Sequence, residues 1–263
     1  MDDCLRSDWI VPFGVSMSTP DIQTLMAEMP EHAGAMRRQV HLACDAAPII
    51  LHLVEFEPEH FSSAFFAQAG IACPESIQRS VGKRQAEFFF GRLAARTALS
   101  ALGIKNETVP IGAERQPIWP NGVIGSMTHT HGLAAVAVEW AGRRRGIGID
   151  VECVMNEQAC EAVVMTVLDR SELHCLQATR ELALPVALTI VFSAKESFYK
   201  AAYGSVRRFF DFSAVRVVEL NVQARRLTFV LTETLSGDFH SSQLFHAGFD
   251  FIKDGVVLTH AVW

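Results

Sequence analysis

Two carboxylates, Asp150 and Glu152, stand two residues apart in the strand-like segment 146–152. Because side chains alternate along a strand, both carboxylates project from one face, roughly 7 Å apart. The intervening Ile and Val side chains project from the other face into a core. Gly146 and Gly148 leave room beside the acidic face for a bulky neighbour. Paired oxygen ligands on a rigid strand suit a hard cation such as Mg²⁺, although two solvated acids at a strand edge would give the same pattern.

A third carboxylate, Glu196, lies downstream in the segment FSAKESFYKA, with Lys200 four residues after it. That spacing places both side chains on one face of a helix. The segment also has a purely structural interpretation. Ser193 and Glu196 have the spacing of a capping box, and Glu196 and Lys200 have the spacing of a helix ion pair.

Basic side chains gather upstream of these acids. A helix is expected over residues 83–102, and Arg84, Arg92 and Arg96 fall on one side of it because they are spaced by multiples of four. Arginine pairs well with phosphate oxygens, so this stripe could bind an anion, or it could be a solvated charged face. His129 ends a polar stretch between strand-like segments; a lone histidine is more often a structural residue.

The elements that must position these groups are strands combined with two long helices. The second long helix is expected over 185–203, kinked or restarted near Ser193, with Gly204 as its stop. Further expected helices cover 21–29, 61–69, 158–168 and 170–178. Expected strands cover 48–56, 133–139 and 146–152, followed by an antiparallel meander over 215–220, 227–232, 245–252 and 256–262. The basic run 143–145 is expected to be a hairpin tip in solvent or part of a docking surface.

Composition limits the function classes. The chain has 263 residues, 49% of them hydrophobic and 20% charged, which fits a globular protein with a full core. Its net charge of -6 argues against a dedicated nucleic-acid binder. The six cysteines form no C-x-x-C pair and no zinc-ligand spacing. No signal peptide or membrane span is recognisable, so a cytoplasmic protein with free thiols is expected.

Four segments occur together in a familiar order and spacing: RQAEFFFGRLAARTAL, RQPIWPNGVIGSMTH, GIGIDVE and FSAKESFYKA. Together they resemble the 4′-phosphopantetheinyl transferases, in the enterobactin- and surfactin-type branch of that family. The resemblance runs from about residue 83 to residue 201, and the first 80 and last 60 residues carry no such signature. It implies an α+β fold of two similar α/β halves related by a pseudo-twofold axis, divided here as 1–143 and 144–263, with the active site between them.

The resemblance also implies roles for individual residues. Asp150, Glu152 and Glu196 would hold Mg²⁺ against the pyrophosphate of coenzyme A; Mn²⁺ is a chemically similar alternative. Lys200 would contact the phosphates or assist proton transfer. The residues that would bind the rest of coenzyme A are His129 and Thr128 at the nucleotide phosphates, Arg84 and Arg92 at the 3′-phosphate, Arg115 as a further basic contact, and Lys83 and Arg96 as accessories.

The implied reaction is attack of a serine hydroxyl of an acyl or peptidyl carrier protein on the β-phosphorus of coenzyme A. The leaving group is 3′,5′-ADP, and Glu196 takes the serine proton directly or through a metal-bound water. A monomer is expected, with Arg207 and Arg208 as candidates for contact with the carrier. Two alternatives are a non-enzymatic binder of coenzyme A or carrier proteins, and a metal-dependent nuclease.

Overall fold

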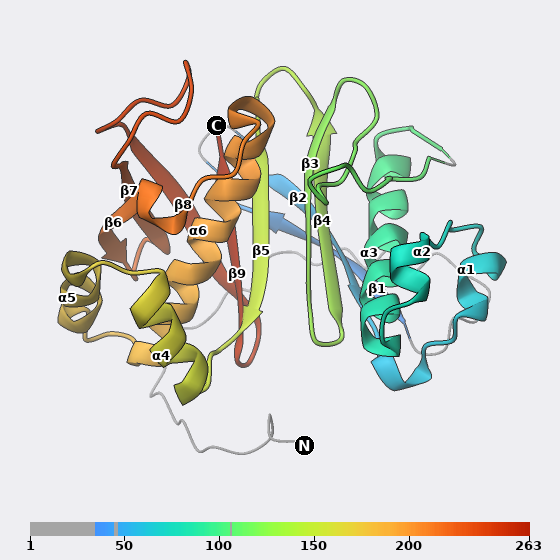
Figure 1. Cartoon of the computed structure of the whole chain (residues 1–263), viewed down its shortest axis with the longest axis horizontal. Coiled ribbons are helices and arrows are strands. Elements are labelled where there is room, and N and C mark those ends of the chain that lie inside the picture. Colours follow the sequence, from blue (N-terminus) through green and yellow to red (C-terminus); the bar gives the residue numbers. More distant parts are fainter. Residues whose placement is uncertain (1–34, 45–46, 106) are drawn as a thin grey trace.

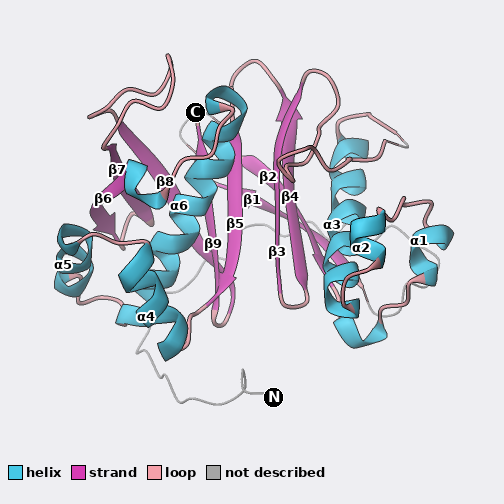
Figure 2. Cartoon of the chain, viewed as in Figure 1, coloured by secondary structure: helices cyan, strands magenta, loops and turns pink. Residues whose placement is uncertain are grey.

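The computed structural model describes residues 35–44, 47–105 and 107–263, which form two antiparallel sheets and their helices (Figures 1 and 2). The first sheet has the strand order β1-β2-β4-β3 and the second has the order β5-β9-β8-β7-β6. The strands of the first sheet are β1 (Met36–Leu42), β2 (Ile49–Glu55), β3 (Val123–Thr130) and β4 (Leu133–Trp140). Those of the second are β5 (Ile147–Cys153), β6 (Val215–Asn221), β7 (Arg226–Leu231), β8 (Leu244–Lys253) and β9 (Val256–Val262).

Each sheet carries one long helix, α3 (Gly82–Ala101) on the first and α6 (Leu184–Val206) on the second. The shorter helices are α1 (Ala64–Gln68), α2 (Glu75–Gln78), α4 (Glu157–Thr166), α5 (Arg170–Ala178) and the 3-10 turns η1 (Pro58–His60) and η2 (Phe212–Ala214). The predicted α+β class is therefore confirmed. Among the described residues, no helix has both the length and the apolar character needed to cross a membrane.

An apolar layer between the two sheets joins the halves into one body. Strand β4 alternates, so that Leu133 and Ala135 enter this shared layer while Ala134 and Val136 face α3. Strand β5 contributes Ile149 and its apolar neighbours to the same layer. The predicted alternation of β5 is thus correct, and its acidic face is turned away from the shared layer, toward α6. The proposed division at 143/144 falls between β4 and β5.

The bulky neighbour of the two β5 glycines is helix α6. A Cβ atom on Gly148 would lie 1.7 Å from the carbonyl oxygen of Ser197, and one on Gly146 would lie 2.0 Å from that of Ala201. Only glycine permits this approach of strand and helix backbones. The close contact is what brings the acidic face of β5 beside the helix that carries Glu196.

Hydroxyl side chains connect the sheets where β3 runs beside β5. Ser126 Oγ accepts a 3.0 Å hydrogen bond from the Ile149 amide, and Thr128 Oγ1 accepts a 3.3 Å bond from the Val151 amide. Alternate residues of β3 share one face, so its polar pattern supplies a row of partners for the backbone of β5. This explains why a stretch expected only as a polar connection is a strand.

Three structural expectations are wrong. Helix α6 runs without a break through Ser193, whose buried hydroxyl lies 2.8 Å from that of Thr259, so Ser193 does not begin a helix and the capping-box interpretation fails. The helix also continues past Gly204 to Val206. Within the basic run 143–145, the expectation fails for Arg144 alone: it is buried and bonded to Glu139 at 2.6 Å, whereas Arg143 and Arg145 are exposed. The helix expected at 21–29 lies outside the described residues.

Candidate active site

Asp150 is at the centre of the acidic cluster on β5. The residue is 4% exposed, and its Oδ1 atom accepts a 2.9 Å hydrogen bond from the Thr128 hydroxyl and a 2.6 Å bond from Lys200 Nζ. Lys200 also donates to the Ile149 carbonyl at 3.2 Å. The second carboxylate oxygen, Oδ2, is buried and has no hydrogen-bond partner among the described residues. A buried charged oxygen without a partner is costly, so this atom is suited to receive a ligand.

Glu152 and Glu196 complete the cluster of negative charge. Burial and the charges of Asp150 and Glu196 raise the pKa of Glu152 to about 7, against the opposing effect of Lys200. Burial also raises the pKa of Glu196, with a further contribution from Asp150. Three half-buried or buried carboxylates share one ammonium group, so the cluster favours an additional positive charge.

This donor set fits a hard divalent cation, because it offers only oxygen ligands, a surplus of negative charge and one unpartnered buried oxygen. Among the described residues, no group of three or more Asp, Glu, His or Cys side chains is already arranged so that it could hold a metal ion. The cation beside Asp150 is the Lys200 ammonium group. Asp150, Glu152 and Glu196 are the residues that could hold Mg²⁺ there.

A basic cluster lies next to the acidic one. Arg84, on the first turn of α3, donates a 2.7 Å hydrogen bond to His129 Nε2, and His129 Nδ1 lies 3.7 Å from Glu87. Because arginine only donates, Nε2 must be an acceptor, so the imidazole is neutral with its proton on Nδ1. Burial lowers the pKa of His129, and the charges of Lys200 and Asp150 act on the same group. The predicted His129, Arg84, Asp150 and Lys200 are thus brought together across β3 and β5.

Arg92 is a second basic residue of this cluster, and one of its buried donor atoms has no hydrogen-bond partner among the described residues. Its guanidinium stacks on the Phe88 ring at 4.5 Å and lies 2.7 Å from Met127 Sδ. Its Nε atom is buried and has no partner among the described residues. Burial, with the charge of Arg84, lowers the pKa of Arg92 to about 10. An anion beside this guanidinium would supply the partner it lacks.

The remaining predicted basic residues are less closely joined to the cluster. Arg96 donates to the Ala69 carbonyl at 2.7 Å, so part of its role is structural. Lys83 is exposed at the start of α3. Arg115 is exposed in a left-handed conformation (φ 64°), and no described residue forms a hydrogen bond or ion pair with its guanidinium. The adjacent Glu114 contributes to a raised pKa of Tyr199, which places this loop near α6.

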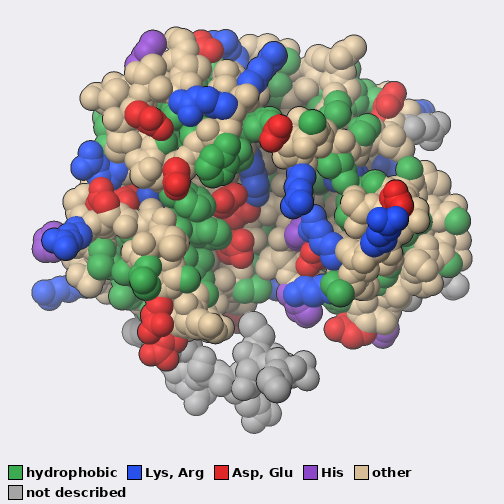
Figure 3. Space-filling view, in the orientation of Figure 1, with side chains coloured by type: hydrophobic (Ala, Val, Ile, Leu, Met, Phe, Trp, Pro, Cys, Tyr) green, Lys and Arg blue, Asp and Glu red, His purple; other side chains and the backbone are tan. Residues whose placement is uncertain are grey.

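Figure 3 shows how these charges are distributed on the surface. A groove runs between the two halves, with acidic side chains gathered along the side of the second sheet. Lysine, arginine and histidine side chains gather along the side of α3. The arrangement can bind a molecule that carries both a metal-chelating group and a separate anionic group.

A cavity of about 210 Å³ opens beside Glu196. One wall is the turn of α6 at 195–199, and the other is the segment 209–212 together with Val215. Neither this cavity nor the position of Glu87 beside His129 was predicted from the sequence. The available signal for the cavity was the aromatic pair Phe209 and Phe210 directly after the helix, of which Phe209 is 76% exposed.

Both halves of the chain match models of known protein families. Residues 73–139 match the family model described as the 4′-phosphopantetheinyl transferase N-terminal domain, and residues 146–258 match that of the 4′-phosphopantetheinyl transferase superfamily. Enterobactin synthase component D from Escherichia coli strain K12 is 38% identical over 168 residues, which cover 63% of this chain and 76% of the relative.

Two further relatives are matched over less of their length. Enterobactin synthase component D from Salmonella typhi is 38% identical over 154 residues, 57% of this chain and 61% of the relative. The 4′-phosphopantetheinyl transferase PptT from Mycobacterium tuberculosis is 34% identical over 144 residues, 54% of this chain and 61% of the relative. With both halves matched and 76% of the Escherichia coli relative covered, the chain belongs to the 4′-phosphopantetheinyl transferase superfamily.

Proposed function

We propose that this chain transfers the 4′-phosphopantetheine arm of coenzyme A to a serine of an apo acyl or peptidyl carrier protein and releases 3′,5′-ADP. The observation that carries the proposal is the junction of the two clusters at β3: Thr128 donates a 2.9 Å hydrogen bond to Asp150, and the next residue, His129, accepts a 2.7 Å bond from Arg84. Coenzyme A has a pyrophosphate and a separate 3′-phosphate. A carboxylate cluster that takes a metal, next to the half-exposed Arg84 and to Arg92, whose Nε atom has no partner among the described residues, suits both groups.

The acidic cluster binds and orients the pyrophosphate. Asp150, Glu152 and Glu196 would hold Mg²⁺, which when bound supplies positive charge that neutralises the pyrophosphate oxygens. Thr128 fixes the Asp150 carboxylate through its 2.9 Å hydrogen bond. Lys200, with a side chain 27% exposed, is free on one side to contact a phosphate oxygen.

The serine proton must be removed as the hydroxyl attacks. Glu196 lies on the wall of the cavity, and burial and Asp150 raise its pKa. A carboxylate with a raised pKa is a stronger base at neutral pH. We assign Glu196 the role of accepting this proton at a carboxylate oxygen, and Lys200 the role of stabilising the phosphate that departs.

The other half of the site holds the nucleotide end of coenzyme A. His129, whose Nε2 atom accepts a hydrogen bond from Arg84, donates its Nδ1 proton to a phosphate oxygen. Arg84 and Arg92 would clamp the 3′-phosphate, and Arg115 would reach it from the loop. Because one chain holds both clusters, we propose that it acts as a monomer, in the cytoplasm where thiols such as Cys153 and Cys160 stay reduced.

The carrier protein must cover the rim of the cavity when its serine reaches Glu196. Arg207 and Arg208 are exposed directly after α6, and Phe209 beyond them is 76% exposed on the cavity wall. Among the described residues, no carboxylate forms an ion pair with either arginine. These three residues form the rim surface, which we propose receives acidic side chains of the carrier around an apolar contact.

The first experiment measures the intact mass of an apo acyl carrier protein after incubation with this chain, coenzyme A and Mg²⁺. The expected result is a mass gain of one phosphopantetheine arm, and no gain when a chelator is added. Apo peptidyl carrier proteins are the second substrate. Binding of coenzyme A without transfer to any carrier would contradict the proposal in favour of a non-enzymatic binder. Cleavage of bare DNA with Mg²⁺ and no coenzyme A would favour the nuclease alternative.

A second experiment tests the rim surface. Arg207→Glu with Arg208→Glu should raise the KM for the carrier by about tenfold while the KM for coenzyme A stays within about twofold. The matched control is Arg180→Glu with Arg226→Glu, two exposed arginines remote from β5 that change the net charge equally. Equal carrier KM values for the two double variants would remove Arg207 and Arg208 from the interface.

A further inference from the structure

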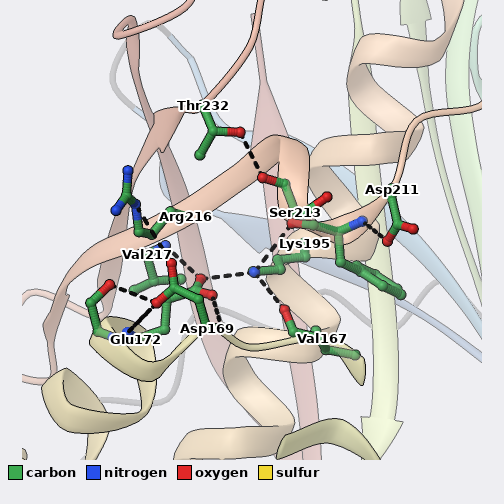
Figure 4. A network of polar contacts seen from close by, with 11 residues as sticks. Val167, Asp169, Glu172, Lys195, Asp211, Ser213, Arg216, Val217 and Thr232 are labelled. Carbon is green, nitrogen blue, oxygen red and sulfur yellow. Dashed lines mark hydrogen bonds and ion pairs between the residues drawn. The ribbon is translucent and has the colours of Figure 1, made fainter. Parts of the chain in front are cut away.

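The residue before Glu196 is a lysine with no access to solvent. The Lys195 side chain is 0% exposed and its Nζ atom lies 2.8 Å from Glu172 Oε1, whose side chain is 3% exposed (Figure 4). Lys195 Nζ also donates to the carbonyl oxygens of Val167 at 2.9 Å and Phe212 at 3.3 Å. An ammonium group has three protons, and these three acceptors use all of them.

Both carboxylate oxygens of Glu172 also have hydrogen-bond partners. Its Oε1 atom also accepts a 2.8 Å hydrogen bond from the Val217 amide, and its Oε2 atom accepts a 2.9 Å bond from the Asp169 amide. The pair therefore ties four segments to one turn of α6: the end of the α4 region, the N-terminus of α5, the turn η2 and strand β6. Figure 4 shows the lysine at the centre of these groups.

The network also joins the two walls of the cavity beside Glu196. Lys195 belongs to the α6 wall and Phe212 belongs to the opposite wall, and the 3.3 Å hydrogen bond runs between them. The position of segment 209–212 relative to Glu196 thus depends on this lysine. The rim surface formed by Arg207, Arg208 and Phe209 lies at the start of the same segment.

The contacts of Lys195 leave it no free proton for a substrate. A phosphate could reach Nζ only by displacing a carbonyl group or the Glu172 carboxylate from a site without solvent access. Lys200 differs, because its side chain is 27% exposed and faces the acidic cluster. The two lysines that flank Glu196 in the sequence therefore have different roles.

We propose that the buried Lys195–Glu172 pair is a positioning device, which holds segment 209–212 against α6 and so fixes the cavity and Glu196 in the geometry for transfer. The inference rests on the proposed function for its kinetic readout only. Lys195 and Glu172 are positioning residues and do not touch the substrate. Their effect passes through the cavity wall.

The test compares Lys195→Met with the double variant Lys195→Met/Glu172→Met, which removes both charges. Removing one partner leaves an uncompensated buried charge, whereas removing both leaves no buried charge, although the backbone groups of Val167, Asp169, Phe212 and Val217 lose their side-chain partners. The control is Arg144→Met, which removes another buried basic side chain and its ion pair with the half-buried Glu139, outside the cavity. Assays are run below the unfolding temperature of every variant.

Hydrogen–deuterium exchange is the readout that does not depend on activity. Amide exchange in peptides covering 209–217 should rise in both Lys195 variants, because the bonds to Val167 and Phe212 are lost in each, and should stay at the wild-type level in Arg144→Met. Unchanged exchange in Lys195→Met would overturn the proposal. If the wild-type protein transfers nothing to any carrier, the proposed function fails while this readout still decides the positioning role.

Kinetics give the second readout. The double variant should regain part of the thermal stability lost in Lys195→Met, because the uncompensated charge is gone, yet keep a kcat reduced by roughly tenfold to a hundredfold, because the cavity wall is displaced. Recovery of wild-type kcat together with stability would show a merely structural pair and overturn the proposal. A rise in the KM for coenzyme A alone, without faster exchange at 209–217, would make Lys195 a substrate ligand and also overturn it.

Discussion

Lys200 Nζ lies 2.6 Å from Asp150 Oδ1, so the ammonium group is the counter-ion of the central carboxylate. It also opposes the effects that raise the pKa values of Glu152 and Glu196. Asp150 on β5 and Lys200 on α6 can meet because the strand and the helix approach each other closely at Gly148. The site is therefore electrostatically incomplete in two ways: it has three carboxylates for the Lys200 ammonium group, and one Asp150 oxygen lacks a partner among the described residues.

The first prediction concerns this counter-ion. Lys200→Met should lower the melting temperature without Mg²⁺, because the carboxylates then repel one another without compensation. Adding Mg²⁺ should raise the melting temperature more in Lys200→Met than in the wild-type protein, because a cation then meets a more negative site. The measurement is thermal unfolding across a Mg²⁺ titration. The control is Lys253→Met, an exposed lysine on β8, and equal Mg²⁺ shifts in the two variants would contradict the prediction.

The second prediction concerns the central acid itself. Asp150→Asn keeps the shape of the side chain and a hydrogen-bond acceptor for Thr128, but removes the charge. Transfer to the carrier should fall by at least about a thousandfold, while the fold is kept. Intact-mass assays and circular dichroism measure the two quantities. Thr128→Ser, which keeps the hydroxyl that holds Asp150, should keep most of the activity, and full activity of Asp150→Asn would exclude Asp150 as a metal ligand.

The third prediction concerns the strand–helix contact. Gly148→Ala would place a Cβ atom 1.7 Å from the Ser197 carbonyl oxygen, so α6 must move away from β5. The free energy of unfolding should fall by about 3 kcal/mol. Transfer should fall further than stability alone explains, because Glu196 and Lys200 move with α6. The control, Gly204→Ala on the same helix, has open space around the new methyl group and should stabilise the protein by about 1 kcal/mol.

Much of the site could be predicted from the sequence because it depends on local spacing. Alternation on β5 correctly separated Ile149 from Asp150, and the i, i+4 spacing correctly placed Glu196 and Lys200 on one helix. The burial of Lys195, in contrast to the partial exposure of Lys200, could not be predicted, because it depends on Glu172, which is distant in the sequence. Arg144 was misjudged for the same reason, since its partners Glu139 and the Ala47 carbonyl are set by the packed fold.

The fold shows the same division between local and tertiary information. The strands β6 to β9 follow apolar alternation and were predicted. Strand β3 was not, because its serine and threonine side chains bond the backbone of β5 instead of forming an apolar face. Among the described strands, β1 pairs only with β2, and its arginines gave no strand pattern; Arg38 is paired there with Glu55 at 2.6 Å. Tertiary contacts, and not local propensity, therefore determine that β1 and β3 form strands.

The fourth prediction concerns stability in acid. His52 on β2 is 4% exposed, and burial lowers its pKa from 6.5 to about 4. A lowered histidine pKa means that the folded state favours the neutral ring, so stability is present above pH 6.5 and is lost as pH falls from 6.5 toward 4. The full loss amounts to about 3 kcal/mol. Denaturant unfolding at pH 7 and pH 5 should show a smaller difference in His52→Gln than in the wild-type protein; an equal difference would exclude this residue as the cause.

The last prediction concerns Arg92, whose buried Nε atom has no partner among the described residues. Arg92→Lys keeps the charge but loses the planar stacking on Phe88 and the fork of donors, so the KM for coenzyme A should rise by roughly tenfold to a hundredfold. The comparison that isolates the contact uses 3′-dephospho-coenzyme A as the substrate. If Arg92 binds the 3′-phosphate, the wild-type protein should use that substrate poorly and the substitution should add little further loss. A control variant, Arg79→Lys on an exposed arginine paired with Glu75, should leave both KM values unchanged. An equal loss for Arg92→Lys with both substrates would mean that its guanidinium supports α3 and not the ligand.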